Sequence, residues 1–284
     1  MTRTSSTVYH AYMTETYHPN MIDSLNHPLA QPIRKLLTRS GRQELNKILI
    51  DDEENILEAY QAGVKIESVY FAGENRLSEN FKKRIPPSIP IYEVATRTSK
   101  KLFENDKLSR VFAIAQTPKP IALDALKSIS KDIVVLEDLS ISGNIGNITR
   151  TSLALGIGGI VLLNMEFVDL YDRRLIRASR GYLFSLPMIT ASTKDFLDYC
   201  KKNNETLLAM DMNAEKTVSE ISSIPHRLLI AFGSEKDGCS PELEQAAHLK
   251  VRIPISDKVE SLNVSASAGI TLFNRVGFNQ TAAD

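Results

Sequence analysis

Short apolar runs that do not alternate with polar residues constrain the fold of this chain more than any other feature of its sequence. Five of them follow residue 130, and helical stretches lie between them, the first expected at residues 148–155. An apolar run without alternation is typical of a strand buried on both faces, as in a parallel sheet covered by helices. The second half of the chain is therefore expected to form an α/β domain. The expected strands are residues 133–136, 159–163, 206–210, 227–232 and 250–253.

Shorter alternating elements before residue 117 predict a second, smaller α/β domain. Its expected strands include residues 66–71, 91–94 and 111–115. Pro118 and Pro120 then flank a turn that indicates a boundary between the two domains. The polar start of the chain has no apolar period and is expected to be a flexible arm. The expected divisions are an arm at residues 1–28, a small domain at 29–122 and a larger domain at 123–284.

Composition excludes several classes of protein. With 43% hydrophobic and 24% charged residues, the 284-residue chain has the composition of a globular protein. No stretch approaches the roughly 20 apolar residues of a membrane span, and the start of the chain lacks the apolar core of a signal peptide. We therefore expect a cytoplasmic protein without membrane contact. Cys200 and Cys239 form no CxxC pair and the histidines are scattered, so we expect no metal site.

Basic residues gather in the first half of the chain, although the whole sequence carries no net charge. The 34 basic and 34 acidic residues cancel, but residues 82–110 hold eight basic side chains against three acidic ones. Such a cluster suits contact with a polyanion, because each cation near phosphates releases condensed counterions. It is equally typical of the solvated surface of helices and loops, so charge alone leaves both interpretations open.

The familiar nucleotide and nucleophile motifs are absent from the sequence. Gly156-Ile-Gly158-Gly159 precedes an expected strand instead of following one, and neither GxGxxG nor GxxxxGK[ST] occurs. Ser234 lies in Gly-Ser-Glu-Lys and not in GxSxG, which argues against a hydrolase. We therefore expect neither a dinucleotide-binding enzyme, nor a P-loop enzyme, nor a serine hydrolase.

Three polar segments each follow a buried strand of the larger domain. They are residues 144–151, 232–238 and 253–265. In open α/β sheets, ligands bind beyond the carboxyl ends of the strands, where such loops converge. Glycines in these loops let a ligand approach the backbone closely. One segment alone would be read as a helix cap or a turn, but three at equivalent strand ends indicate a shared binding site.

The three segments resemble the motifs of the TrmH branch of the SPOUT methyltransferases, in the same order and with similar spacing. The motifs are Asn144-x-Gly146-x-x-x-Arg150-Thr151, Phe232-Gly-Ser-Glu235-x-x-Gly238 and Ile253-Pro254 … Ser261-Leu-Asn-Val-Ser265. A further segment resembles the thiostrepton- and nosiheptide-resistance methyltransferases, because most other members carry a small residue at the position of Arg180. That segment is Arg177-Ala-Ser-Arg180-Gly-Tyr-Leu-Phe-Ser-Leu-Pro187. The resemblance covers about residues 30–280.

The resemblance implies an architecture and a cofactor. The larger domain would be a SPOUT domain, an α/β fold whose C-terminal segment threads a loop to form a deep trefoil knot. The small domain would be a ribosomal-protein-L30e-like module. The family acts as homodimers, so we expect a dimer formed through the SPOUT domain, with the apolar face of residues 262–273 in its interface. S-adenosyl-L-methionine would lie in the knot loops. Its expected contacts are Met210, Gly233, Ile253, Leu262, Arg150 and Arg180.

The resemblance also implies the reaction, which transfers a methyl group to a ribose 2′-oxygen. Arg150 would be the central residue, with Asn144, Glu235, Ser261 and Asn263 around it. A guanidinium group stays protonated up to about pH 12, so Arg150 is a poor general base. We expect it to clamp the neighbouring phosphate and orient the hydroxyl, while the proton leaves late to solvent or to a carboxylate. The competing interpretation makes Arg150 a helix-surface cation and Glu235 a carboxylate at a helix start.

RNA contacts are expected at Arg180 and at basic side chains of the small domain. An L30e-like module would recognise a structured RNA loop by its shape and phosphates. Arg180 would face RNA or cofactor from the partner subunit, whereas Arg173 and Arg174 are expected on a solvated helix face. Phe103 and Phe112 are expected in the core. The remaining RNA-binding candidates are Lys82, Lys83, Arg84, Arg97, Lys100, Lys101 and Arg110.

The expected function is that of an S-adenosylmethionine-dependent 23S rRNA (adenosine-2′-O)-methyltransferase of the type that confers resistance to thiopeptide antibiotics. One alternative keeps the chemistry and changes the target to a guanosine in ribosomal or transfer RNA. The separate small domain and Arg180 argue against transfer RNA. A second alternative is a catalytically silent RNA-binding protein. The intact motif residues argue against it: Asn144, Arg150, Glu235, Ser261 and Asn263.

Overall fold

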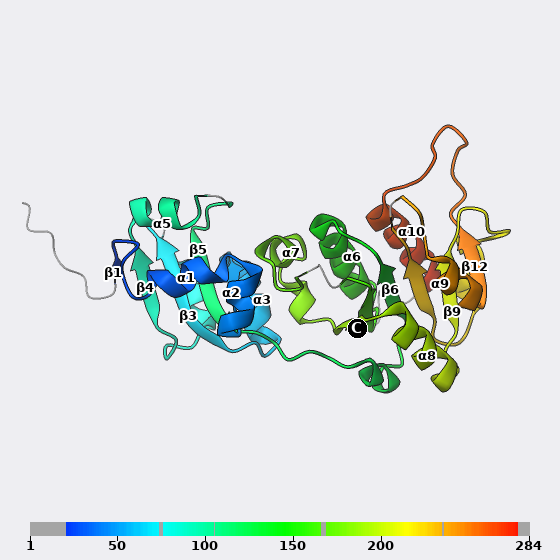
Figure 1. Cartoon of the computed structure of the whole chain (residues 1–284), viewed down its shortest axis with the longest axis horizontal. Coiled ribbons are helices and arrows are strands. Elements are labelled where there is room, and N and C mark those ends of the chain that lie inside the picture. Colours follow the sequence, from blue (N-terminus) through cyan, green and yellow to red (C-terminus); the bar gives the residue numbers. More distant parts are fainter. Residues whose placement is uncertain (1–20, 74–75, 105, 166–168, 235, 278–284) are drawn as a thin grey trace, which may run out of the picture.

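The structure is a computed structural model, and it describes residues 21–277 apart from residues 74, 75, 105, 166–168 and 235. Within this part of the chain the strands form two sheets, one of five strands and one of seven. The sheets lie toward opposite ends of an elongated molecule, and helix α7 (Arg173–Ala178) lies between them (Figure 1). The α/β fold class predicted from the sequence is confirmed.

The first sheet contains parallel and antiparallel pairs. Its strands are β1 (Met21–Ile22), β2 (Lys47–Asp51), β3 (Ile66–Ala72), β4 (Ile91–Val94) and β5 (Val111–Gln116). Their order is β1-β4-β3-β5-β2, in which β5 runs antiparallel to both neighbours and the other pairs are parallel. The accompanying helices are α1 (Ala30–Leu36), α2 (Arg39–Leu45), α3 (Glu53–Gln61), α4 (Glu79–Arg84) and α5 (Thr96–Leu102). Helices α1 and α5 pack on one face, and α3 and α4 pack on the other.

The expectation of a flexible arm that reaches residue 28 is wrong for residues 21–28. Met21 and Ile22 pair with β4, and Ile22 is completely buried between the sheet and α1. A strand of two residues is too short to show a period in the sequence, so the pattern gave no sign of it. The part of the arm before residue 21 lies outside the described residues.

The second sheet is entirely parallel. Its strands are β6 (Ile133–Glu137), β7 (Gly159–Leu163), β8 (Met188–Ala191), β9 (Leu207–Met210), β10 (Lys216–Thr217), β11 (Leu229–Phe232) and β12 (Leu249–Arg252). Their order is β10-β12-β9-β11-β6-β7-β8. Every residue of β6, β7 and β11 is buried, as the absence of alternation predicted. The sequence missed the short edge strands β8 and β10.

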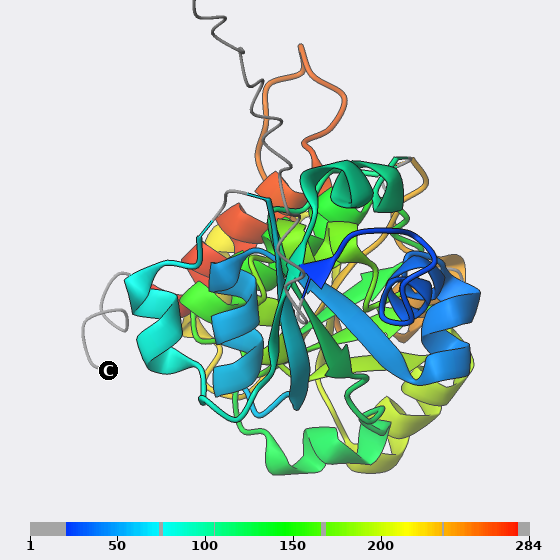
Figure 2. The ribbon, with the colours of Figure 1, turned by 90° about the vertical axis from the view of Figure 1, so that its left-hand side faces the viewer.

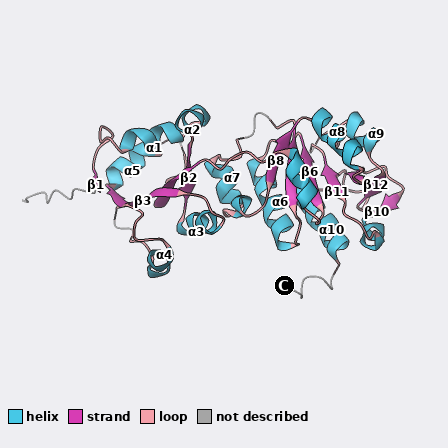
Figure 3. Ribbon diagram, turned by 90° about the horizontal axis from the view of Figure 1, so that it is seen from below, coloured by secondary structure: helices cyan, strands magenta, loops and turns pink. Residues whose placement is uncertain are grey.

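Helices cover both faces of the second sheet. The helices are α6 (Ser142–Ala154), α7, α8 (Thr193–Asn203), α9 (Pro241–Ala246) and α10 (Val264–Val276). Helices α6, α7 and α10 pack on one face, and α8 and α9 pack on the other (Figure 3). Helix α8 has clear ends, because the Ser192 side chain caps its first turn and Asn204 takes a left-handed conformation after its last. No helix in the described part of the chain is long and apolar enough to cross a membrane.

Helix α6 begins six residues earlier than the sequence predicts. The expected helix began at residue 148, after a polar loop, whereas the structure places Asn144 and Arg150 on one helix that starts at Ser142. Gly143 and Gly146 concealed the start, because glycine has low helix propensity. Gly146 serves close packing: a Cβ atom there would lie 2.4 Å from the Cβ atom of Ala178 in α7. The first polar segment is therefore part of a helix and not a loop.

Candidate functional site

Three parallel strands of the second sheet end at the same edge, and the segments that follow them enclose a cavity. Strand β9 lies between β11 and β12, and all three run in one direction. The cavity has a volume of about 640 Å³, which lies within the range of small-molecule sites. Its lining comes from residues 210–213, 232–234, 236–238, 252, 253, 255 and 260–262, together with Glu244 of α9 and Val264 and Ser267 of α10. The segment between β12 and α10 projects from the body of the molecule (Figures 1 and 2).

The cavity brings together the predicted cofactor positions that lie in loops. Met210, Gly233, Ile253 and Leu262 all line it, and so does Ser261. These residues come from three segments that are separated by up to fifty residues of sequence. Arg150 and Arg180, also predicted to contact the cofactor, are not among its lining residues in this chain.

The loop after β11 requires a glycine at position 233. A Cβ atom on Gly233 would lie 1.9 Å from the carbonyl carbon of Gly238, because the loop closes on itself. The Ser234 amide donates to the carbonyl oxygen of Gly238 at 2.9 Å, and the Gly238 amide donates to the carbonyl oxygen of Ser234 at 3.1 Å. Gly238 adopts a left-handed backbone with φ of 73°. The tight loop forms one wall of the cavity.

The wall of the cavity combines apolar side chains with a surplus of acidic ones. Phe232, Ile253 and Leu262 offer apolar surface, while Asp211, Asp237, Glu244 and Glu260 face two basic residues, Lys236 and Arg252. Lys250 lies beside this wall and pairs with Glu244 at 3.1 Å and with Asp211 at 3.7 Å. Asp237 and Glu260 form no ion pair within the described residues. The cavity therefore suits a ligand that has an apolar ring system and carries positive charge.

Asn144 and Asn263 join α6 to the start of α10. The Asn263 side-chain amide donates to Oδ1 of Asn144 at 3.2 Å, and Asn144 is 7% exposed. Oδ1 of Asn263 also accepts from the backbone amide of Ser265 at 2.9 Å and so caps α10. This pair fixes the turn of α10 that carries Val264 and Ser267, which line the cavity. The structure thus links the first and third predicted motifs through side chains.

Arg150 lies on α6, and its half-buried side chain makes no hydrogen bond or ion pair within the described residues. A buried or half-buried arginine usually has an acidic partner. Its guanidinium group is therefore free to bind an anion. Glu235, the predicted carboxylate near it, lies outside the described residues.

Helix α7 differs in part from the solvated helix face that was predicted for Arg173 and Arg174. Arg174 is exposed as expected, but Arg173 is 2% exposed and pairs with Asp51 at 2.8 Å and Asp106 at 2.7 Å. The sequence could not show this, because Asp51 lies 122 residues away. Arg180 is exposed, with φ of 52°, and its side chain makes no hydrogen bond or ion pair within the described residues.

Comparison with known proteins identifies the family. The model of the SpoU rRNA methylase family matches residues 131–273, which include the whole second sheet and its cavity. The chain belongs to the SpoU rRNA methylase family. A second model, which describes the N terminus of thiostrepton-resistance methylases, matches residues 19–129. The resemblance seen in the sequence motifs is confirmed.

Relatives of this SpoU methylase match almost the whole chain. A 23S rRNA (adenosine(1067)-2′-O)-methyltransferase from Streptomyces azureus is 34% identical over 264 residues, which cover 92% of this chain and 98% of the relative. An enzyme of the same name from Streptomyces laurentii is 36% identical over 249 residues, covering 86% and 90%. The crystal structure of an RNA 2′-O ribose methyltransferase, at 30% identity, covers 90% of this chain and 98% of its own with a TM-score of 0.76.

The basic candidates of the SpoU methylase's first sheet are all exposed but do not form one face. Three of them lie on α4 and three on α5, and these helices pack on opposite faces of that sheet. Lys82 pairs with Glu79 at 2.8 Å. Phe103 and Phe112 are buried, as predicted. The candidates on α4 are Lys82, Lys83 and Arg84, those on α5 are Arg97, Lys100 and Lys101, and Arg110 precedes β5.

Sequence reasoning missed Glu137, a buried carboxylate beside the cavity wall. Glu137 is 1% exposed, and it accepts hydrogen bonds from the Ser240 amide at 2.7 Å and from the hydroxyls of Ser240 and Thr193 at 2.8 Å each. It thereby holds the first turns of α8 and α9, and α9 follows the Gly233 loop. The sequence signal that could have revealed Glu137 is a charged residue directly after the apolar run of residues 133–136.

Cys239, which directly follows the Gly233 loop, is buried and is not a nucleophile. Burial, and to a smaller extent the negative charge of Glu137, raise the pKa of its thiol to about 12. The thiol therefore stays protonated at neutral pH. Within the described residues, no cluster of three His, Cys, Asp or Glu side chains could hold a metal ion.

Proposed function

We propose that this SpoU methylase transfers a methyl group from S-adenosylmethionine to the ribose 2′-oxygen of an adenosine in 23S ribosomal RNA, and that the modification confers resistance to thiopeptide antibiotics. The observation that carries the proposal is the match to two enzymes of that activity at 34% and 36% identity, over 92% and 86% of this chain. The match to thiostrepton-resistance methylases at residues 19–129 supports the same subgroup. An rRNA substrate implies a cytoplasmic protein.

The cavity fits the proposed cofactor. S-adenosylmethionine supplies an electrophilic methyl group on a positively charged sulfonium. Met210, Gly233, Ile253 and Leu262 would hold it, with the adenine against the apolar residues and backbone groups of the loops. The unpaired acidic side chains of the wall complement its positive charge.

We assign the remaining motif residues to the RNA side of the reaction. Arg150 binds the phosphate next to the target ribose with its bidentate guanidinium and orients the 2′-hydroxyl. Asn144 and Asn263 hold α6 and α10 in register, so that Arg150 and Ser261 face the same nucleotide. The hydroxyl proton leaves to solvent or to a carboxylate such as Glu235, while Arg150 stays protonated. Arg180 acts from the partner subunit on RNA or cofactor.

The proposed architecture follows the family. Residues 29–122 would form an L30e-like RNA-recognition domain and residues 123–284 a SPOUT domain with a deep trefoil knot. The order of the second sheet supports the knot, because β12, the last strand, lies between β9 and β10 instead of at an edge. Ile270 and Phe273 support a homodimer through α10, since they are 38% and 48% exposed apolar residues on one helix. The basic residues of α4, α5 and Arg110 would contact the RNA.

Methyl-labelled S-adenosylmethionine tests the proposal directly. The protein is incubated with a 23S rRNA fragment, a 16S rRNA fragment and unmodified transfer RNA, and label in each RNA is counted. Label in the 23S fragment alone supports the proposal. Label in transfer RNA favours the guanosine or transfer-RNA alternative, and cofactor binding without transfer to any RNA favours the silent RNA-binding protein.

A further inference from the structure

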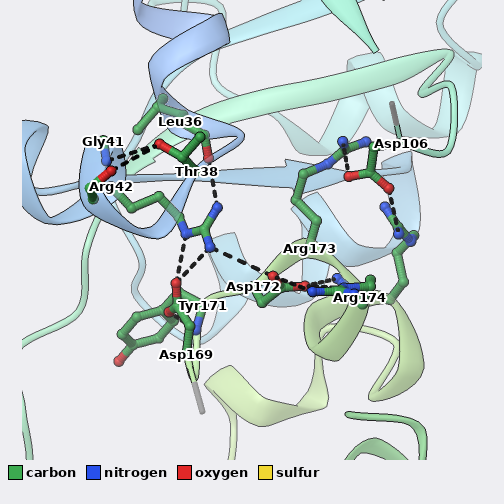
Figure 4. A network of polar contacts seen from close by, with 12 residues as sticks. Leu36, Thr38, Gly41, Arg42, Asp106, Asp169, Tyr171, Asp172, Arg173 and Arg174 are labelled. Atoms are coloured by element: carbon green, nitrogen blue, oxygen red, sulfur yellow. Dashed lines mark hydrogen bonds and ion pairs between the residues drawn. The ribbon is translucent and has the colours of Figure 1, made fainter. Parts of the chain in front are cut away.

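The two halves of the molecule meet where β2 and α3 contact α7 and residues 182–184, a contact region that we call the seam. A buried cluster of charges crosses this seam. Asp51, at the end of β2, accepts two hydrogen bonds of 2.8 Å from the guanidinium group of Arg173 and one of 2.5 Å from Arg177. Arg173 also pairs with Asp106 (Figure 4). Its guanidinium carbon lies 4.5 Å from the centroid of the Phe103 ring. The side chains of Asp51 and Arg173 are both 2% exposed. A charge so deeply buried requires its partners.

A second ion pair fixes the seam at another point. Arg42 of α2 donates to Asp169 from two nitrogen atoms, at 2.8 Å and 2.6 Å, and a third nitrogen donates to the carbonyl oxygen of Leu36 at 2.8 Å (Figure 4). Its side chain is 6% exposed. Two directional ion pairs at separate points of the seam fix the angle between the two halves of the molecule, which a single ion pair cannot do.

Apolar packing joins the two halves, but it is less directional than the ion pairs. The core is continuous across the seam, with Ile56 of α3 and Leu183 in one cluster, but apolar contact has no directional preference. A cavity of about 580 Å³ also opens along the seam, between Lys65 on one side and Tyr171 on the other. The first sheet and its helices would have room to pivot if the ion pairs were absent.

The seam also carries the turn that presents Arg180. Gly181, with φ of 77°, lies directly against α3: a Cβ atom there would be 3.1 Å from Cα of Asn55 and 3.0 Å from Cβ of Glu58. Asp52, between β2 and α3, is held at φ of 67° and ψ of 141°, a strained backbone for a residue with a side chain. Such strain persists where the surrounding structure imposes it, and it is concentrated at functional positions.

We propose that Asp51 and Arg173 are positioning residues for the methyl transfer. Their ion pair sets the angle between the unit that binds the RNA loop and the unit that holds the cofactor. It thereby determines which ribose reaches the cavity and where Arg180 lies. The inference rests on the proposed function, because it assigns the choice of nucleotide to the seam. A buried ion pair is a weak source of stability, since well-packed apolar residues do as well, but it specifies geometry.

The first test measures the angle without any RNA. Spin labels are attached to Asn80→Cys in α4 and Asp198→Cys in α8, both exposed, while the native Cys200 and Cys239 are buried. We expect a narrow distance distribution in the otherwise native protein and in Arg174→Gln, which removes an exposed arginine from the same helix. Asp51→Asn is expected to broaden or shift the distribution. An unchanged distribution overturns the proposal.

The second test measures the reaction. Asp51→Asn is expected to lower kcat for the 23S fragment by roughly 10- to 100-fold, because a misplacement of about 1 Å can cost that much, and to place methyl groups on neighbouring riboses. Cofactor affinity should be unchanged, and Arg174→Gln should behave as the native protein. If the distances change while the rate and the modified position do not, the positioning role is refuted. If the native protein methylates no RNA, the proposed function fails and the positioning role falls with it, while the distances still show whether the ion pair sets the angle.

A pair of glycine substitutions repeats the test if Asp51→Asn does not fold. Gly181→Ala and Gly63→Ala both place a side chain at positive φ, but a Cβ atom on Gly63 meets nothing within 4 Å. Both variants carry the backbone strain of a side chain at positive φ, but only Gly181→Ala pushes the two sides of the seam apart. The same shift and the same loss of positional fidelity are expected in Gly181→Ala alone. Equal behaviour of the two variants contradicts the proposal.

Discussion

Arg150 differs from the arginines around it in what it binds. Arg173, Arg177 and Arg275 are each held by a carboxylate at 2.5–2.8 Å, whereas Arg150 has no such partner within the described residues. A half-buried cation without a partner is poorly compensated, and an incoming phosphate would compensate it. This contrast separates an arginine that organises the fold from one that is available to a substrate.

Replacement of Arg150 should therefore affect transfer and not cofactor binding. Arg150→Ala is expected to lower kcat by about 10²–10³-fold, the usual cost of removing one preorganised donor at a reacting centre. The dissociation constant for S-adenosylmethionine, measured by calorimetry, should stay the same. Equal loss of binding and rate would make Arg150 a structural residue. Arg174→Ala, at an exposed arginine, is the matched control.

Replacement of Gly233, in contrast to that of Arg150, should weaken cofactor binding. Gly233→Ala introduces a Cβ atom 1.9 Å from the Gly238 carbonyl carbon, so the loop must open and cofactor affinity should fall by about tenfold or more, or at least 1.4 kcal/mol. Gly143→Ala is the control, because its Cβ atom would meet its nearest neighbour at an ordinary 3.9 Å. Calorimetric titration that finds equal affinity in both variants would show that the loop does not form the site.

Among the secondary-structure elements, β6 contributes to the site through its last residue. Glu137 ends a strand that is buried throughout, and its carboxylate satisfies the first turns of two helices at once. Parallel strands place such side chains where helix N-termini gather, so one carboxylate orders the first turns of both α8 and α9 on the same face of the sheet. The β11–α9 loop that lines the cavity depends on this contact.

Glu137→Gln should loosen that loop. Both carboxylate oxygens of Glu137 accept hydrogen bonds, whereas the glutamine side chain has only one oxygen that can accept them. A buried amide group left without a partner costs about 1–3 kcal/mol of unfolding free energy. We expect that loss in urea denaturation, together with weaker cofactor binding. Glu242→Gln, in the exposed first turn of α9, should cost about 0.5 kcal/mol or less. If the two variants are equally stable, Glu137 does not hold the helices.

At the scale of the whole molecule, the sequence predicted the second sheet better than the arrangement of the two halves. The strands β6, β7, β9, β11 and β12 were predicted within two residues, because continuous apolar runs report burial on both faces. The loop residues of the cavity were found through the family motifs. The start of α6 was missed because glycines obscured it, and the Asp51–Arg173 contact was missed because it joins residues 122 positions apart, which no local pattern records.

The buried thiols are expected to lower the stability of the molecule at alkaline pH. Burial raises the pKa of Cys200 and of Cys239 from 9.0 to about 12. Between these values the unfolded thiols ionise while the native ones stay protonated, so the native state loses stability as pH rises above 9 and keeps the full contribution below it. Each thiol contributes a slope of about 1.4 kcal/mol per pH unit. Cys200→Ala should reduce the slope measured by denaturation, and a slope equal to that of the native protein would contradict the burial effect.

The identity of the methylated nucleoside tests the central claim most directly. The 23S rRNA fragment treated with the protein and methyl-labelled S-adenosylmethionine is digested to nucleosides, and the labelled product is identified by mass spectrometry. The cavity, the free Arg150 and the family together predict 2′-O-methyladenosine at a single position. A label on a base, or on the ribose of guanosine, would contradict the account.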